Sequence, residues 1–395
     1  MLVISNLEYG GAQRQIVELA NHLDPAGFDV RICSLSPYVP LADDLRRPDR
    51  LHILTKRFKF DASVVPRLAA LLRRTRTDVV QSYLFDADIA AFLAGRLAGC
   101  SLVAGSERNA NYVMKRRQIL LYRMTRRCVD LLIANSHAGA EFNERVVGYP
   151  SSCYRVVHNG VDTTRFAPAD AGALRAELGI AAGEQVVGMF ASFKQQKNHP
   201  LFFRAAARVI EKFPRTRLLL VGDELYAGMH GSDAYKRDVL DLVERLGLRD
   251  RCIFAGNQDA VERYYPVCDI TVMSSHFEGT ANAVLESLAC GVPVVATAVS
   301  DTAMILPDGR AGYVVAPGDE TAMSERIGAL LGDVQLRSRM AQAARQWIVE
   351  EFSSERLAAK TADVYMRELN ARQLPRRRPA AVADRPRAVD HRARS

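Results

Sequence analysis

The chain has 395 residues, of which 48% are hydrophobic and 25% charged, a size and composition that predict two ordinary globular domains and exclude disorder throughout. The formal net charge is +8, but residues 371–395 contain eight Arg and two Asp and so carry +6 of it. The body of the chain carries only +2, so its bulk charge says little about what it binds, and we expect no nucleic-acid partner.

Short apolar runs alternate with helical stretches in the first half of the chain. Strands are expected at residues 1–5, 29–35, 78–83, 101–105, 131–136 and 154–160. Helices are expected between them, at residues 12–24, 63–76, 86–98, 113–127 and 137–146. Alternation of helices with nearly continuous apolar strands predicts a parallel, doubly wound sheet. We therefore expect a Rossmann-like N-terminal domain of residues 1–165.

The second half repeats this scheme after a linker rich in Gly, Asp and Pro at residues 159–172. Strands are expected at residues 185–191, 217–222, 251–256, 269–275 and 292–298. Helices are expected at residues 198–213, 233–246, 281–290 and 319–349. The chain is thus expected to be an α/β protein whose second Rossmann-like domain spans residues 166–352. No short-period repeat is present, which excludes a solenoid.

The end of the chain divides into two segments. Residues 353–370 have the pattern of a final amphipathic helix, which we expect to cross back to the N-terminal domain. Residues 371–395 are rich in Pro, Arg and Ala and lack periodicity, so we expect a disordered basic tail. Two interpretations stay open: a solvated tail, and a polybasic contact with anionic lipid.

Cysteine usage and hydropathy bear on the compartment. The seven cysteines are scattered and form no Cys-x-x-Cys pair, which is typical of reduced thiols and argues against a disulfide framework or a zinc site. No secretory signal is visible, and no segment approaches the roughly 18 apolar residues of a membrane span. We expect a cytoplasmic protein, with a peripheral position on the inner face of the plasma membrane as an open alternative.

The strongest motif is the segment "SSHFEGTANAVLESLACGVPVVAT" at residues 274–297. A predicted strand ends here at a Glu-Gly turn that holds Glu278, and Glu286 follows about two turns into the next helix. Backbone N–H groups at the start of that helix, with its positive dipole end, suit a diphosphate. Glu286 lies where an acidic side chain can accept hydrogen bonds from sugar hydroxyls. The residues expected at the donor are Gly279, Thr280, Ala281 and Asn282.

This segment resembles the donor signature of glycosyltransferase family four, which belongs to the GT-B superfamily. The resemblance extends over roughly residues 2–370. It implies two Rossmann-like domains that face each other across a cleft, and a retaining hexosyltransferase that uses a nucleoside-diphosphate sugar of the UDP or GDP type. It also implies that Glu278 holds donor-sugar hydroxyls and takes part in catalysis, and that Glu286 holds the ribose. No metal and no further cofactor are expected.

A second match is the segment "VVGMFASFKQQKNHPLFFRAA" at residues 186–206. It resembles the family segment in which an Arg and a Lys hold the donor diphosphate, because a leaving diphosphate gains negative charge in the transition state. Lys197 matches the Lys and is expected to take part in catalysis. Ser192 stands where the family has the Arg, and Lys194 is the candidate for the second charge.

Further matches place other residues at the donor. "LEYGGAQRQIVELANHL" at residues 7–23 resembles the family loop beside the donor phosphates, so Gly10 and Gly11 are expected to approach the ligand closely. The segment at residues 254–275 resembles the stretch that lines the base, with Asn257 as a candidate contact. The turn at residues 156–166 resembles the start of the family's interdomain linker.

The acceptor side departs from many relatives. Their histidine near the reacting carbon is replaced here by Tyr83, Asp86 and Arg108, of which Arg108 is the candidate for catalysis because it ends a predicted strand. A surface ion pair is the alternative for it. Met304 and the pair Ser300–Asp301 replace a Glu and Gly-Gly of relatives, so the sequence does not identify the donor sugar. The segments around these residues resemble family members of polysaccharide or lipid-linked glycan assembly.

Three alternative functions compete with this one. The segment "DAD" at residues 86–88 matches the Asp-x-Asp metal site of the other glycosyltransferase superfamily, but it begins a helix in a first Rossmann half and is not expected to bind metal. A nucleotide-sugar epimerase of the same fold would need acid–base residues that are not evident. A non-catalytic nucleotide-sugar-binding subunit stays open as an alternative function.

The basic helix at residues 112–128 is either a solvated face or a contact with an anionic membrane.

Overall fold

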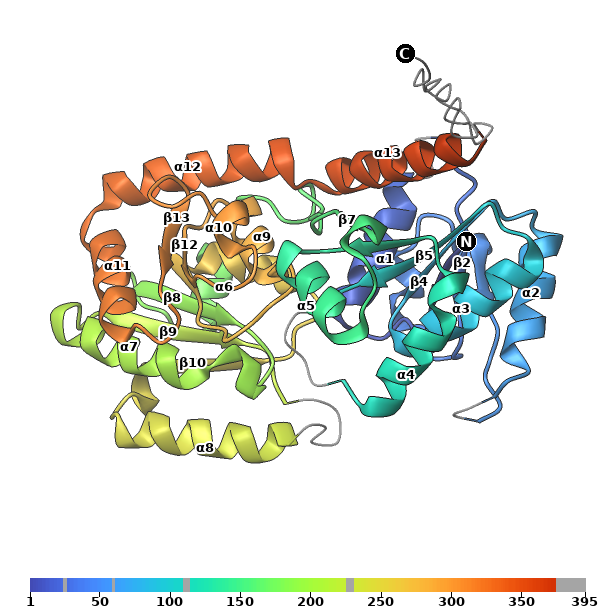
Figure 1. Ribbon diagram of the computed structural model, residues 1–395. Coiled ribbons are helices and arrows are strands. Elements are labelled where there is room, and N and C mark those ends of the chain that lie inside the picture. Colours follow the sequence, from blue (N-terminus) through green and yellow to red (C-terminus); the bar gives the residue numbers. More distant parts are fainter. Residues whose placement is uncertain (24–26, 59–60, 109–113, 225–230, 374–395) are drawn as a thin grey trace, which may run out of the picture.

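A computed structural model describes residues 1–23, 27–58, 61–108, 114–224 and 231–373. The described chain forms two α/β lobes that lie side by side, each built on one parallel sheet (Figure 1). The expected fold class, two doubly wound Rossmann-like domains, is confirmed. Within the described part of the chain, no helix combines the length and apolar character that crossing a membrane requires.

The N-terminal sheet has seven parallel strands in the order β3-β2-β1-β4-β5-β6-β7. They are β1 (Leu2–Ile4), β2 (Ile32–Ser34), β3 (Leu51–Ile53), β4 (Val79–Tyr83), β5 (Leu102–Glu107), β6 (Leu131–Ala134) and β7 (Tyr154–Val156). The helices are α1 (Gly11–Leu23), α2 (Val64–Arg74), α3 (Phe85–Ala98), α4 (Arg116–Thr125) and α5 (His137–Val147). All six expected strands and five expected helices are present, and β3 is an additional edge strand.

The C-terminal sheet has six parallel strands in the order β10-β9-β8-β11-β12-β13. They are β8 (Gln185–Phe190), β9 (Thr216–Val221), β10 (Cys252–Gly256), β11 (Ile270–Met273), β12 (Val294–Thr297) and β13 (Gly312–Val315). Its helices are α6 (Gly172–Glu177), α7 (His199–Lys212), α8 (Ser232–Arg245), α9 (Asn282–Ala289), α10 (Thr302–Ile305), α11 (Glu320–Gly332) and α12 (Val334–Glu351).

One expected helix is wrong in extent. The helix predicted at residues 319–349 is two helices, α11 and α12, which meet at Asp333. The Asp333 side chain accepts a hydrogen bond of 2.8 Å from the Leu336 N–H, so it caps the start of α12. Such a cap satisfies one of the orphan N–H groups of a helix and stabilises a new helix start by about 1 kcal/mol.

The last helix returns to the first domain. α13 (Ser354–Gln373) packs against α1, and α12 and α13 run along one side of the molecule over both lobes (Figure 1). The chain therefore crosses between the lobes twice, and the two crossings are bonded to each other. The Val161 N–H donates to the Phe352 carbonyl at 2.9 Å, and the Ser354 N–H donates to the Val161 carbonyl at 3.0 Å. Residues 374–395, most of the predicted tail, lie outside the described residues.

All seven cysteines are free thiols in this structure. Four of them are buried and three are partly buried. Burial raises the pKa of Cys33 and of Cys252 to about 12, which leaves these thiols protonated and unreactive at neutral pH.

The two aspartates of "DAD" have separate partners. Asp86 pairs with Lys56 at 3.2 Å, whereas Asp88 is buried and accepts hydrogen bonds of 2.7 Å from the Ser82 and Tyr122 hydroxyls. Asp88 thus ties together the end of β4, the start of α3 and the middle of α4. Burial raises the pKa of Asp88 to about 7, in spite of these two hydrogen bonds.

Replacing Asp88 by Asn is expected to flatten the dependence of stability on pH. A raised carboxyl pKa favours folding while the group is protonated, and this contribution is lost as pH rises from about 4 to about 7, by about 1.4 kcal/mol for each tenfold change in the acid dissociation constant. Thermal unfolding of both proteins at pH 5 and pH 8 measures the effect. An Asp88→Asn variant with the same pH dependence as the wild type would contradict it.

Candidate functional site

A cleft of about 650 Å³ lies between the two lobes, at the carboxyl ends of the strands. In each sheet the strand order reverses, between β1 and β4 and between β8 and β11, and open α/β sheets bind ligands at such points. The cleft walls carry all twelve residues predicted for the site: Gly10, Gly11, Arg108, Lys194, Lys197, Asn257, Glu278, Gly279, Thr280, Ala281, Asn282 and Glu286.

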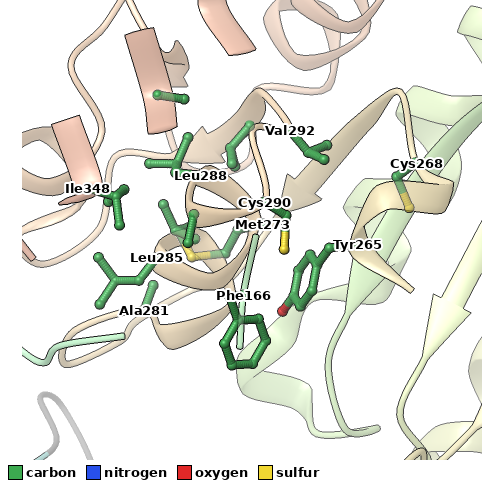
Figure 2. Packing of buried hydrophobic residues seen from close by; sticks show 14 of the residues in the cluster. Phe166, Tyr265, Cys268, Met273, Ala281, Leu285, Leu288, Cys290, Val292 and Ile348 are labelled. Carbon is green, nitrogen blue, oxygen red and sulfur yellow. The ribbon is translucent and has the colours of Figure 1, made fainter. Parts of the chain in front are cut away.

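The start of α9 forms one wall of the cleft. The helix begins at Asn282, and no side chain caps it, so its first N–H groups are open to a ligand. Its opposite face is anchored by a buried cluster in which Leu285 and Leu288 pack towards α12 (Figure 2). This apolar anchor fixes the direction in which the polar end of α9 points.

The turn before α9 holds Glu278, whose buried side chain accepts two short hydrogen bonds. Its Oε1 atom accepts hydrogen bonds of 2.6 Å from Lys197 Nζ and of 2.6 Å from Ser275 Oγ. Gln196 fixes the same turn, because its Nε2 donates to the Phe277 carbonyl at 2.8 Å. The two segments resembling the family, far apart in sequence, thus meet in one ion pair at the carboxyl ends of β8 and β11.

Lys194 stands on the same wall without a matching anion. Its Nζ makes no hydrogen bond or ion pair with any described residue, although the side chain is partly buried. Burial, and then the charge of Lys197, lower the pKa of Lys194. A desolvated cation beside a helix start favours an anionic ligand. Ser192, in the same loop, contributes a neutral wall.

Glu286 lies deeper in the cleft, against Tyr265. The Tyr265 hydroxyl donates to Glu286 Oε2 at 2.6 Å, and burial raises the pKa of Glu286. The Tyr265 ring stacks on Phe190 at 3.7 Å between centroids. It meets Phe166 edge-on at 5.9 Å (Figure 2). The sequence did not identify Tyr265, although it lies within the stretch predicted to line the base.

The neighbouring wall carries the base-side candidate. Asn257 is exposed at the cleft edge, just after β10. Gly222, at the end of β9, has φ +127°, and a Cβ there would lie 2.3 Å from the Ala191 carbonyl oxygen. Only glycine fits this close approach of two strand ends.

Arg108 reaches the cleft from the N-terminal lobe and is not a surface ion pair. It donates to Asn159 Oδ1 at 2.7 Å, and Asn159 donates in turn to Asn282 Oδ1 at 2.6 Å, at the start of α9. Its guanidinium lies over the Tyr83 ring, 5.4 Å from the centroid. Burial lowers the pKa of Arg108.

The two lobes touch closely around the glycines of the site. A Cβ on Gly279 would lie 2.6 Å from Asn135 Oδ1, and one on Gly11 would lie 3.1 Å from Asn282 Nδ2. Thr280 donates from its hydroxyl to the Asn135 carbonyl. The starts of α1 and α9 therefore converge on the same cleft from opposite lobes.

Asp301 forms an interdomain contact that the sequence did not reveal. It is buried, and its Oδ2 accepts from the His137 N–H at 2.8 Å, from His137 Nδ1 at 2.8 Å and from His158 Nε2 at 2.7 Å. Burial opposes its ionisation, but the hydrogen bonds from His158 and His137 hold the pKa of Asp301 well below its usual value. Met304, the other departure noted nearby, is exposed and lies away from the cleft walls.

These three side chains also have metal-ligand chemistry. Among the described residues, His137, His158 and Asp301 are the one group whose ligand atoms lie close enough together, within 4.8 Å, to hold an ion. The short contacts of Asp301 with both imidazoles, and its bond to the His137 N–H, account for the arrangement as a hydrogen-bonded ion pair.

Comparison with known families gives two adjoining matches. The family described as "Glycosyltransferase Family 4" matches residues 9–165, and "Glycosyl transferases group 1" matches residues 170–347. The boundary between the two matches falls in the interdomain linker, and together they contain every residue predicted for the site.

Individual relatives are more distant. The chain is 26% identical to the N-acetyl-alpha-D-glucosaminyl L-malate synthase of Bacillus anthracis, over 78% of this chain and 79% of that protein. It is 32% identical to the D-inositol 3-phosphate glycosyltransferase of Nocardia farcinica, over 53% of this chain and 47% of that protein. The second match thus spans about half of the relative's length.

Solved structures share the fold over nearly the whole chain. HepE of Anabaena, crystallised with UDP, superposes with a TM-score of 0.81 at 20% identity, covering 93% of this chain and 99% of that one. Sucrose-phosphate synthase of Thermosynechococcus elongatus gives a TM-score of 0.76 at 20% identity, covering 94% and 99%. With both lobes matched in sequence and in fold, the chain belongs to glycosyltransferase family 4 and has the GT-B fold.

Proposed function

We propose that the protein transfers a sugar from a nucleoside-diphosphate sugar to an acceptor hydroxyl, with retention of the anomeric configuration. One observation carries the proposal: the Lys197–Glu278 pair stands beside the uncapped start of α9, with Glu286 further along the same helix and all three in the interdomain cleft. A nucleotide sugar contains a sugar, a diphosphate and a ribose in that order, and Glu278, the start of α9 with Lys197, and Glu286 offer a partner to each.

Each group has a role in the proposed reaction. The diphosphate lies at the start of α9 near Lys194 and Lys197, Glu286 accepts from the ribose hydroxyls, and Glu278 accepts from hydroxyls of the transferred sugar. The bond from the anomeric carbon to the phosphate oxygen breaks, and a bond to the acceptor oxygen forms on the same face. The acceptor proton passes to the departing phosphate oxygen. The helix start and the lysines compensate part of the developing negative charge, and the proposed step uses no metal.

Closure of the two lobes favours transfer of the sugar to the acceptor over its hydrolysis by water. The starts of α1 and α9 meet across the cleft, which restricts water at the reacting carbon. Arg108 reaches the start of α9 through Asn159 from the acceptor side, and we propose that it orients the acceptor.

Removing the carboxylate of Glu286 is expected to abolish donor binding. The side chain lies in the cleft and is hydrogen-bonded only to Tyr265 among the described residues, so its second oxygen is available to a ribose. In thermal-shift measurements with UDP, GDP and their sugars, one base at about 100 times its dissociation constant stabilises the protein by about 2.7 kcal/mol. Glu286→Ala loses this shift. A folded wild type that responds to none of these nucleotides would count against the proposed function.

For the acceptor we propose a glycan or a lipid-linked glycan, as in cell-surface polysaccharide synthesis. The support is α4 with the turn that follows it, which present exposed Leu120 and Met124 among the exposed Arg116, Arg117 and Arg127, the pattern of a helix that lies on an anionic membrane. The protein would then be a peripheral protein on the cytoplasmic side. The names of two relatives instead contain small hydroxylated anions, malate and inositol 3-phosphate, so these belong in the same acceptor assay.

A further inference from the structure

The proposed reaction poses a problem of charge in the cleft. The diphosphate of a nucleotide sugar carries about two negative charges, and the departing diphosphate gains about one more in the transition state. Among the described residues, four cationic side chains line the cleft: Arg14, Arg108, Lys194 and Lys197.

Two of these four cations are already engaged. Lys197 lies 2.6 Å from Glu278, so the pair together has little net charge. Arg108 is committed to Asn159 and to the Tyr83 ring. On the C-terminal wall only Lys194 is left, since Ser192 in the same loop is neutral. One ammonium group and a helix start, together about +1.5, fall short of the roughly three negative charges of the departing diphosphate.

Arg14 is the fourth cation, and it comes from the opposite lobe. It follows Gly10 and Gly11 by one helical turn on the same face of α1, so a phosphate that approaches the two glycines meets its guanidinium. Its side chain makes no hydrogen bond or ion pair with any described residue, although it is partly buried. Its charge lies near Glu286, whose pKa it lowers against the effect of burial.

The position of Arg14 is fixed by its neighbour in sequence. The buried Gln15 donates to the Gly160 carbonyl at 2.7 Å and accepts from the Gly160 N–H at 3.0 Å, which pins the first turn of α1 to the interdomain linker. The start of α1 then stands against Asn282 at the start of α9. The backbone from which the Arg14 side chain extends is thus fixed at the cleft, and its guanidinium has no hydrogen-bond partner among the described residues.

We propose that Arg14 is a catalytic residue that binds the donor diphosphate from the N-terminal lobe and supplies the charge that Ser192 lacks. This inference rests on the proposed function. A guanidinium offers two parallel N–H groups to a phosphate, which a lysine does not. Because Arg14 and Lys194 belong to different lobes, the leaving group is fully compensated only while the lobes are together.

The test compares nucleotide and nucleoside binding by isothermal titration calorimetry, with UDP against uridine and GDP against guanosine. Arg14→Gln is expected to weaken binding of the diphosphate at least tenfold and to leave binding of the nucleoside within twofold of the wild type. The affinity of Arg14→Lys for the diphosphate is expected to lie between those of Arg14→Gln and the wild type. Adding Ser192→Arg to the Arg14→Gln protein is expected to restore most of the lost affinity for the diphosphate.

Arg165→Gln is the matched control. Arg165 also has its charge near Glu286, but its guanidinium bonds to Glu262 at 3.0 Å and lies outside the cleft walls. The Arg165→Gln variant is expected to bind UDP or GDP with the affinity of the wild type. Circular dichroism melting confirms that each variant is folded.

Three outcomes decide between the hypotheses. A diphosphate affinity of Arg14→Gln within twofold of the wild type, with affinity lost in Glu286→Ala, overturns the role of Arg14 and leaves the proposed function standing. An equal loss for nucleoside and diphosphate also overturns it, because Arg14 would then act through the ribose site. A folded wild type that binds no nucleotide overturns both.

Discussion

Replacing Glu278 by Gln is expected to lower the turnover of the nucleotide sugar by about 10²–10³-fold while the protein still binds the free nucleoside diphosphate. Glu278 is buried, and it is the one anion that Lys197 contacts among the described residues. Loss of its charge removes an acceptor for the sugar hydroxyls and releases Lys197 from its fixed geometry. Single-turnover product formation and nucleotide affinity, measured on the same preparation, give the two quantities.

Lys197→Ala should show a similar loss, and the double variant should lose little more, since groups that act as a unit are strongly non-additive. Glu320→Gln serves as the control, because Glu320 is also paired with a cation, Arg208 at 3.7 Å, but on the surface. Wild-type turnover in Glu278→Gln would contradict the assignment. Nucleotide binding without turnover in the wild type would favour the non-catalytic subunit.

Replacing Asp301 by Ala is expected to separate the two lobes. The substitution leaves His137 and His158 without their shared hydrogen-bond acceptor, and hydrogen bonds to a charged group contribute about 1.5–3 kcal/mol each. We expect a lower unfolding temperature, a larger radius of gyration in small-angle X-ray scattering, and a large loss of turnover because the cleft no longer closes. The lowered pKa of Asp301 means that its contribution is present at neutral pH and is lost only as pH falls below the usual carboxyl range.

Asp301→Asn is the milder partner of this variant, since an amide oxygen still accepts one of the hydrogen bonds. Its unfolding temperature and radius of gyration are expected to lie between those of Asp301→Ala and the wild type. An unchanged radius of gyration in Asp301→Ala would contradict the interdomain role. A wild-type unfolding temperature that falls when EDTA is added would show that an ion, and not hydrogen bonding alone, joins these three residues.

The order and type of most elements could be predicted, because apolar periodicity differs clearly between buried parallel strands and amphipathic helices. β3 and β13 escaped prediction for a local reason. They have three and four residues at the edges of their sheets, and β3 has no buried residue to mark it. The division of α11 from α12 did leave a mark in the sequence, the capping Asp333, but apolar residues continue on both sides of it.

The candidate site was predictable where strand ends bring residues together. Glu278 and Lys197 follow neighbouring strands of one sheet, and the resemblance named both before their contact was known. The partners of Asp301 could not be foreseen, since they lie 143 and 164 residues away and depend on how the two lobes pack. Tyr265 was hidden among apolar neighbours, where a buried aromatic residue is most often simply part of the core.

The paired crossings between the lobes restrict how the enzyme can move. A single peptide tether would let one lobe swing, slide and twist against the other. Here two segments of backbone, at Val161 and at Phe352–Ser354, run together, and a Cβ on Gly160 would lie 2.8 Å from Leu357 Cβ. The two joined crossings resist sliding and twisting of the lobes, so we expect hinge rotation at these crossings to be the motion that costs least free energy. Opening for product release would then follow one fixed arc, and its speed could be changed by substitutions at the hinge that leave every residue of the cleft untouched.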